Sequence, residues 1–97
     1  MWYHSHARCG FMADCEKLLE AARTNPAGVR FAEICALAEC FGWTFSRQAG
    51  SHRLYKRKGD PNLMNFQDRN GRAKAYQVRQ LVAAIDELGA EDQDDEV

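Results

Sequence analysis

The fold of this chain is decided by the stretch Phe41–Tyr55, which reads FGWTFSRQAGSHRLY. Upstream of it, apolar residues recur every three to four positions, as on one face of a helix. From Trp43 onward the period changes to two, which is typical of a β-strand. Residues 49–51 (Ala-Gly-Ser) form a link short enough to join two antiparallel strands as a hairpin. The stretch therefore predicts a helix that ends at Phe41 and a sheet that begins immediately after it.

Three segments of the chain show the helical period. Each has apolar residues at intervals of three and four, the spacing that places them on one face. They are residues 14–24, with Cys15, Leu18, Leu19 and Ala22; residues 30–41, with Phe31, Ile34, Leu37, Ala38 and Phe41; and residues 74–88, with Val78, Leu81, Val82, Ile85 and Leu88. Gly42 and Gly89 follow the second and third stripes, where glycine often ends a helix. We expect helices over these ranges.

Short strand-like segments lie between the second and the third predicted helix. They start at Trp43, include Leu54–Tyr55 and cover Leu63–Phe66, with turns at residues 59–62 and at Asn70-Gly71. Trp43 and Phe45 are expected in the core. The order α-α-β-β-β-α predicts an α+β fold, a three-stranded antiparallel sheet with the second and last helices on one face. The other face is then free to carry polar residues and a ligand.

The composition is that of one small globular domain. The chain has 97 residues, of which 45% are hydrophobic, and no apolar run approaches the ~20 residues that a membrane-spanning helix needs. We expect a flexible arm over residues 1–12, a single domain over residues 13–89 and a disordered acidic tail over residues 90–97. The first residues lack the apolar segment of a signal peptide, so a cytoplasmic protein is expected.

Charge is strongly segregated along the chain, although the formal net charge is only -1. Between Arg47 and Arg79 nine bases stand against two acids, and from Asp86 to Val97 there are seven acids and no base. The total charge therefore hides a basic segment and an acidic segment. A basic segment of this kind favours an anionic partner such as a nucleic acid.

None of the four cysteines forms a C-x-x-C pair. Cys35 and Cys40 lie five residues apart in the second predicted helix, so they point in different directions. A disulfide framework is not expected in a cytosolic chain, and at least one of these two cysteines is predicted to be a buried free thiol. His4, His6 and Cys9 are of ligand type but match no closed zinc pattern, so no metal is expected.

His52 follows the hairpin turn Gly50-Ser51 in the most basic part of the chain. Histidine is the side chain that can both take and give a proton near neutral pH. Alternation along the second strand places His52 with Leu54, and Arg53 with Tyr55 on the other face. If Leu54 enters the core, His52 turns inward as well, unless the turn or a bulge redirects it. The sequence leaves this choice open.

Residues 30–88 resemble the HicA family of bacterial toxins, small proteins that cleave messenger RNA. The resemblance rests on an ordered set of features: a helix that ends at Gly42, an aromatic strand, Gly50-Ser51-His52, a basic strand and a final helix that includes Gly71–Leu81. It implies a fold like that of double-stranded RNA-binding domains and a HicB-like antitoxin as protein partner. Many members carry a Val-Pro-x-His-like sequence at the end of the third strand, where this chain has Asn65–Asp68.

The resemblance further implies the toxin of a type II toxin–antitoxin pair, a metal-independent endoribonuclease without a cofactor. RNA is cleaved when its 2′-hydroxyl attacks the adjacent phosphorus, and His52 is expected to act as general base or acid in that step. The residues expected to bind the RNA are Arg47, Gly50, Ser51, Arg53, Lys56, Arg57 and Lys74. Tyr55 is expected to stack a base or, if its pKa is lowered, to donate a proton.

Two other functions stay open at this point. The same scaffold can bind RNA without cleaving it, and the altered third strand favours this alternative. The first predicted helix can instead dock a partner protein through the apolar face that begins at Cys15. Incubation of the purified protein with RNA separates the three functions, because only the first predicts cleavage and only the first two predict salt-dependent binding.

Overall fold

The described part of the chain begins and ends with a helix, and the sheet lies between them. The computed structural model describes the backbone of residues 14–96 and the side chains of residues 14–88. Its elements are a helix over residues 14–24, the 3-10 helix η1 (Pro26–Gly28), α2 (Phe31–Cys40), β1 (Trp43–Ala49), β2 (His52–Arg57), β3 (Asp60–Gln67) and α3 (Ala75–Glu96). The α+β class and the order α-α-β-β-β-α are confirmed. The predicted arm over residues 1–12, with His4, His6 and Cys9, lies outside the described residues.

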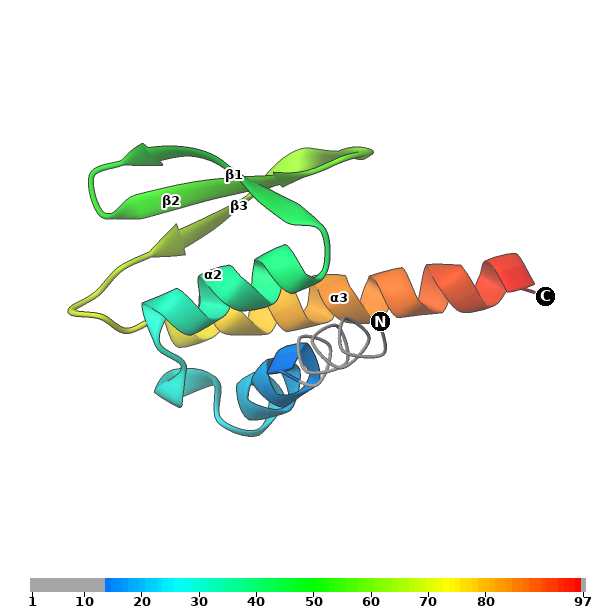
Figure 1. Cartoon of the computed structure of the whole chain (residues 1–97), viewed down its shortest axis with the longest axis horizontal. Coiled ribbons are helices and arrows are strands. Elements are labelled where there is room, and N and C mark those ends of the chain that lie inside the picture. The colour runs from blue at the N-terminus through cyan, green and yellow to red at the C-terminus, as the bar shows by residue number, and fades with distance from the viewer. Residues whose placement is uncertain (1–13, 97) are drawn as a thin grey trace, which may run out of the picture.

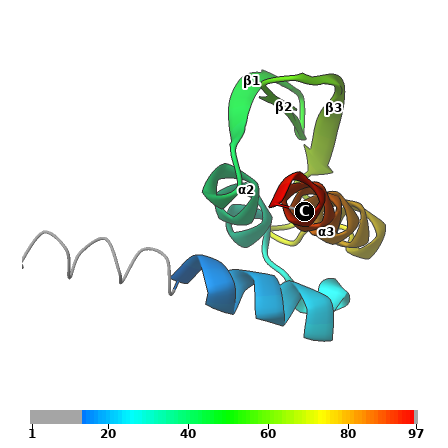
Figure 2. The same ribbon diagram turned by 90° about the vertical axis from the view of Figure 1, so that its right-hand side faces the viewer.

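The elements form three layers. The sheet is one outer layer, α2 and α3 both lie across the same face of it, and the helix over residues 14–24 lies beyond them (Figure 1, Figure 2). No helix of the described residues covers the other face of the sheet, which we call the open face. This arrangement is the one that the sequence predicted. Within residues 14–96, none of the helices combines the length and the apolar character needed to cross a membrane.

All three strands pair antiparallel in the order β1-β2-β3. Gly50-Ser51 joins β1 to β2, as expected, and Lys58-Gly59 joins β2 to β3. The turn expected over residues 59–62 is therefore wrong, because Asp60–Asn62 already belong to β3. Pro61 is tolerated there since β3 is an edge strand, where a missing backbone N–H need not interrupt a ladder.

The core lies between the sheet and the helices. Its largest fully buried side chains are Trp43, Tyr55, Phe66, Ile34, Leu37, Leu81 and Val78. The helical residues among them lie on the predicted apolar stripes. Phe45 was expected in the core, but its side chain is 48% exposed. It lies on the edge strand β1, where one side of its ring packs against Tyr55 with centroids 6.0 Å apart, and the Arg53 guanidinium lies 5.1 Å from its centroid.

The last helix is longer than predicted. α3 spans Ala75–Glu96, so Gly89 does not end it, and residues 90–96 continue the helix instead of forming an unstructured tail. A glycine inside a helix costs about 1 kcal/mol relative to alanine, and an isolated one is tolerated within a long helical pattern. Val97 lies outside the described residues.

A disulfide bond links Cys15, in the first helix, to Cys40, the last residue of α2. The expectation of no disulfide is therefore wrong, because the fold brings the two Cα atoms to 5.9 Å although 25 positions separate them in sequence. Such a contact depends on how two helices pack and has no signature in residue spacing. Cys35 is buried and free, as predicted for at least one thiol of α2.

The apolar face of the first helix packs against the rest of the chain. Cys15 and Ala22 are buried, and Leu18 and Leu19 are partly buried against the core. Most of this face is therefore used in packing within the chain, which argues against the hypothesis that it docks a partner protein.

Candidate nucleic-acid interface

Strand β2 decides which side chains reach the open face. Tyr55 is fully buried beneath the helices, 5.4 Å from Phe66 between ring centroids. Because side chains alternate along a strand, His52, Leu54 and Lys56 lie on the open face. Leu54 is only half-buried there, since the larger Tyr55 occupies the core position. The choice that the sequence left open is thus resolved, and His52 faces outward.

The imidazole of His52 is held by one neighbour across the sheet. Its Nδ1 lies 3.0 Å from Oδ1 of Asn65, which stands on β3. An amide oxygen only accepts hydrogen bonds, so Nδ1–H is the donor, and the neutral ring keeps a free lone pair on Nε2. The contact with Asn65 therefore orients the ring and favours the tautomer with the hydrogen on Nδ1. The nitrogen left free is the one that can accept a proton.

Cross-strand pairing brings positive charge to the same face. Leu54 pairs with Arg47 of β1 and with Asn65 of β3, and directly paired residues share a face of the sheet. Arg47 reaches the open face because the register of β1 shifts between Phe45 and Arg47, and one extra residue reverses the alternation in the rest of the strand. Around His52, the open face therefore carries Arg47, Leu54, Lys56 and Asn65.

The hairpin turn lies directly beside His52. Gly50 has a φ of +61°, and a Cβ added there would meet nothing within 4 Å. Glycine is thus required by the backbone conformation and not by lack of space. The Ser51 carbonyl accepts the Asp68 N–H at 2.8 Å, which fastens the turn to the chain leaving β3. The structure therefore places both predicted turn residues next to the imidazole, at one end of the open face.

Two predicted RNA-binding residues lie elsewhere. Arg53 and Arg57 alternate with His52 and point toward the helix side of the sheet. The Arg53 guanidinium lies over two aromatic rings, 5.1 Å from the centroid of Phe45 and 5.9 Å from that of Phe31. Arg57 donates from Nε to the carbonyl of Phe41 at 3.0 Å. Both arginines therefore lie on the opposite face from His52 and have structural contacts there, as the alternation along the strand predicted for Arg53, so they do not belong to the group of side chains around the imidazole.

Tyr55 cannot play either of the roles expected for it. Its side chain is 0% exposed, so its ring is not available to stack a base. Burial raises the pKa of Tyr55 to about 12, and the neighbouring Cys35 thiol adds to the rise. A proton donor for catalysis needs a lowered pKa, which is the opposite direction.

Lys74, the remaining predicted RNA-binding residue, does not belong to the open face. It lies just before α3 and lines a concavity to which none of the residues around His52 contributes. Conversely, Asn65 belongs to the site but was noted in the sequence only as a departure from the family pattern. The signal that finds it is the pairing register of β2 and β3, because His52 and Asn65 become diagonal neighbours only in that register.

Known proteins do not decide between the remaining functions. Comparison with protein-family models, with curated proteins and with solved structures gives no match to this chain.

Proposed function

We propose that this protein is a metal-independent endoribonuclease, the toxin of a type II toxin–antitoxin pair, with His52 as its proton-transfer residue. The observation that carries the proposal is the placement of one oriented imidazole on an open, basic sheet face. Its Nδ1 is engaged by Asn65 at 3.0 Å, its Nε2 has no hydrogen-bond partner among residues 14–88, and Arg47 and Lys56 share the face.

The chemistry that fits this arrangement is attack within the RNA itself. The Nε2 lone pair takes the proton of a 2′-hydroxyl, the 2′-oxygen forms a bond to the adjacent phosphorus, and the bond from phosphorus to the 5′-oxygen breaks. The leaving oxygen takes a proton, from the imidazolium or from water. The products are a 2′,3′-cyclic phosphate and a 5′-hydroxyl. Because the nucleophile belongs to the substrate, the step needs no metal-bound water.

The cations on the face have a separate role. Arg47 and Lys56 would hold the scissile or adjacent phosphate and offset the charge that develops on it in the transition state. Their positions on β1 and β2, opposite and beside Leu54, allow them to approach an RNA strand laid across the sheet. This role predicts that replacing either Arg47 or Lys56 by an uncharged residue weakens both RNA binding and RNA cleavage.

A protein partner of the HicB antitoxin type would cover the same face in a cytoplasmic complex. Support comes from the apolar residues on the face, since Leu63 of β3 is 50% exposed and Leu54 is half-buried. These two leucines give a partner an apolar contact on a face that is otherwise polar and basic. Such a cover would keep RNA from His52 until the partner is removed.

Cleavage of a defined single-stranded RNA tests the proposal. The parent protein should produce 2′,3′-cyclic phosphate ends in the presence of a chelator, and His52→Ala should lower the rate by about 10²-fold or more while the circular dichroism spectrum is unchanged. Asn65→Leu should lower the rate about tenfold without weakening RNA binding, because it releases the ring and leaves the cations in place. Lys58→Ala, in the distant β2–β3 turn, is the control. If His52→Ala cleaves at the parental rate, the proposed mechanism is wrong.

A second candidate function is RNA binding without cleavage. The observation that favours it is the lack of a second imidazole in residues 14–88, so that the leaving oxygen has no second histidine to protonate it and depends on the same ring or on water. It predicts salt-dependent binding of the same RNA by the parent and by His52→Ala, with intact RNA recovered from both.

A further inference from the structure

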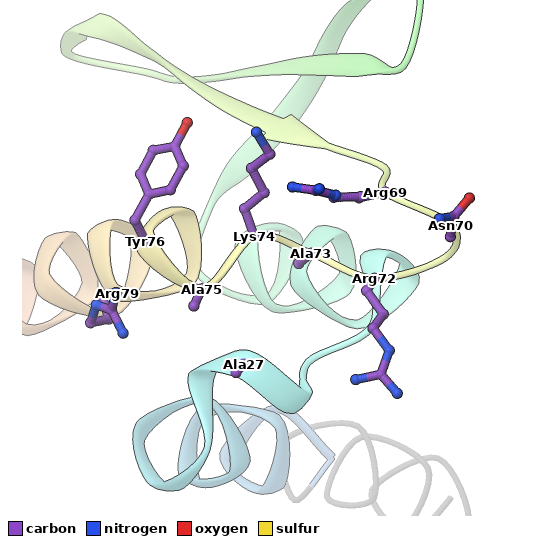
Figure 3. A pocket seen from close by; sticks show the side chains of 9 residues that line it. All are labelled: Ala27, Arg69, Asn70, Arg72, Ala73, Lys74, Ala75, Tyr76 and Arg79. Atoms are coloured by element: carbon purple, nitrogen blue, oxygen red, sulfur yellow. The ribbon is translucent and has the colours of Figure 1, made fainter.

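Positive charge also gathers away from the open face, around the loop after β3 and the first turn of α3. A concavity of 710 Å³ opens to solvent there, between this loop, α3 and η1. Four of the side chains that line it are basic, and none is acidic (Figure 3). The basic ones are Arg69, Arg72, Lys74 and Arg79. We call this concavity the loop pocket.

The charges of the loop pocket have no counter-charge within the described side chains. Across residues 14–88 the ion pair that forms joins Arg23 to Asp86 and involves no pocket residue. Asp68, the acid closest in sequence, is engaged by the backbone, since its Oδ1 accepts the Gly71 N–H at 2.8 Å. Figure 3 shows the Arg69 guanidinium extending toward the Lys74 side chain. The same figure shows the Arg72 side chain pointing away from these two, toward η1. Two neighbouring cations without an acidic partner, such as Arg69 and Lys74, favour an anionic ligand.

The start of α3 adds backbone donors to the same pocket. The N–H groups of Gln77 and Val78 bond to the Lys74 carbonyl at 3.0 and 3.1 Å. The two preceding N–H groups, of Ala75 and Tyr76, have no acceptor among the described residues. Free N–H groups and the helix dipole both favour a negative group at this position.

An exposed aromatic ring stands at the edge of the loop pocket. Tyr76 is 53% exposed, and the Lys74 Nζ lies 6.0 Å from its ring centroid. The core does not need this ring, in contrast to the buried Tyr55. A ring beside a group of cations is the arrangement that binds single-stranded nucleic acids, where the cations contact the backbone and the ring stacks on a base. The bases of an A-form duplex are stacked on one another and cannot offer a face to Tyr76.

We propose that the loop pocket is a second RNA site, which binds a phosphodiester of a single strand through Arg69 and Lys74 and stacks one nucleobase on Tyr76, with Arg72 and Arg79 adding positive charge on its other side. The substrate class is that of the proposed function, on which this inference rests, while the residues are distinct from the open face. The loop that carries Arg69 starts at Asp68, whose N–H bonds to Ser51 beside His52. A strand held in the loop pocket is therefore anchored next to the end of the sheet that carries the imidazole.

Fluorescence anisotropy with a labelled single-stranded RNA tests this inference, with all variants built on His52→Ala so that the probe stays intact. Tyr76→Ala should weaken binding about tenfold, and Tyr76→Phe should restore it. Arg69→Ala/Lys74→Ala should weaken binding and reduce the slope of log affinity against log salt by about 1.4, as expected for two lost phosphate contacts on a single strand. Lys17→Ala/Lys58→Ala removes the same charge from distant surfaces and should reduce the slope by less than half as much.

Further probes separate the sources of phosphate. A duplex RNA of the same length should be insensitive to Tyr76→Ala. If the pocket variants lose binding of adenosine monophosphate or inorganic phosphate but bind the single strand like His52→Ala alone, the pocket serves free phosphates and the inference is overturned. Parental RNA binding by every pocket variant overturns it as well, while cleavage by the parent protein still supports the proposed function. If RNA binding depends on the pocket but the parent protein does not cleave the RNA, the second site is supported and the proposed nuclease function is refuted. If no form of the protein binds RNA, both proposals are refuted.

Discussion

Loss of the Cys15–Cys40 disulfide should strongly destabilise the protein. The bond closes a loop of 25 positions, and the chain-entropy relation gives a stabilisation of about 3.5 kcal/mol for a loop of that size. A domain of this length has a total stability of about 5–15 kcal/mol, so the bond supplies a large share of it. With a urea dependence of about 1.5 kcal/mol per molar, the unfolding midpoint should fall by about 2 M.

The assay is urea unfolding followed by the fluorescence of the buried Trp43. Cys40→Ser removes the bond and leaves the buried Cys15 in place, which limits the loss of packing. The parent in reductant should match this variant, and the variant itself should not respond to reductant. The bond lies between the first helix and α2, away from the open face, so RNA binding below the unfolding transition should be unchanged. If reductant leaves the parental midpoint unmoved, and alkylation labels both cysteines in the native protein, then the bond does not exist and the reasoning fails.

Three further predictions concern stability. Tyr55→Phe should be at least as stable as the parent at pH 7, because the buried hydroxyl has no hydrogen-bond partner among the described residues and such a group costs about 1–3 kcal/mol. The pKa of Tyr55 is raised to about 12, so the folded state holds this proton more tightly than the unfolded state. The associated stability is therefore complete below pH 10 and lost toward pH 12, by about 2.7 kcal/mol. Urea unfolding at several pH values should show that loss in the parent and not in the variant. Asp86→Asn should cost at most about 1 kcal/mol at pH 7, because the pair with Arg23 is exposed. Arg23 lowers the pKa of Asp86 below its ordinary value of 3.8, so thermal unfolding should show this difference vanish as the pH falls below that range. Gly50→Ala should lower the free energy of unfolding by about 1–2 kcal/mol in the same assay. The whole loss should come from the positive φ at this position, since nothing crowds it. This reason is contradicted if the loss is smaller than the loss caused by an alanine substitution at an exposed position of a helix.

The sequence alone predicted the features that depend on a local pattern of residues. The apolar stripes of the helices predicted the buried Ile34, Leu37, Val78 and Leu81, and the turn at Gly50 was predicted from its residue types. These features depend on neighbours along the chain. They need no knowledge of which elements pack together.

Other features depend on contacts between distant segments, and the sequence did not predict them. Leu54 and Tyr55 both suit a core, and only the packing of α2 and α3 shows that Tyr55 occupies it. The bulge after Phe45 brings Arg47 to the open face, although no turn residue marks it. The partnership of His52 with Asn65 needs the register of two strands. These three features affect the arrangement of the candidate site more than they affect the fold. The sequence therefore predicted the fold better than it predicted the site.

The alternation of Tyr55 and His52 along β2 also limits how this protein can change over generations. Substitutions in the hairpin leave the two faces in place, provided that the turn keeps its glycine. The insertion or deletion of one residue between the turn and Tyr55 would move every later side chain of the strand to the opposite face. A change between His52 and Tyr55 would place both side chains on one face, so either Tyr55 would lie in water or the imidazole would enter the interior. One event would then damage either folding or chemistry. In descendants of this chain, length changes in β2 should therefore come in pairs of residues, so that the separation between the histidine of the turn and the buried aromatic residue stays an odd number.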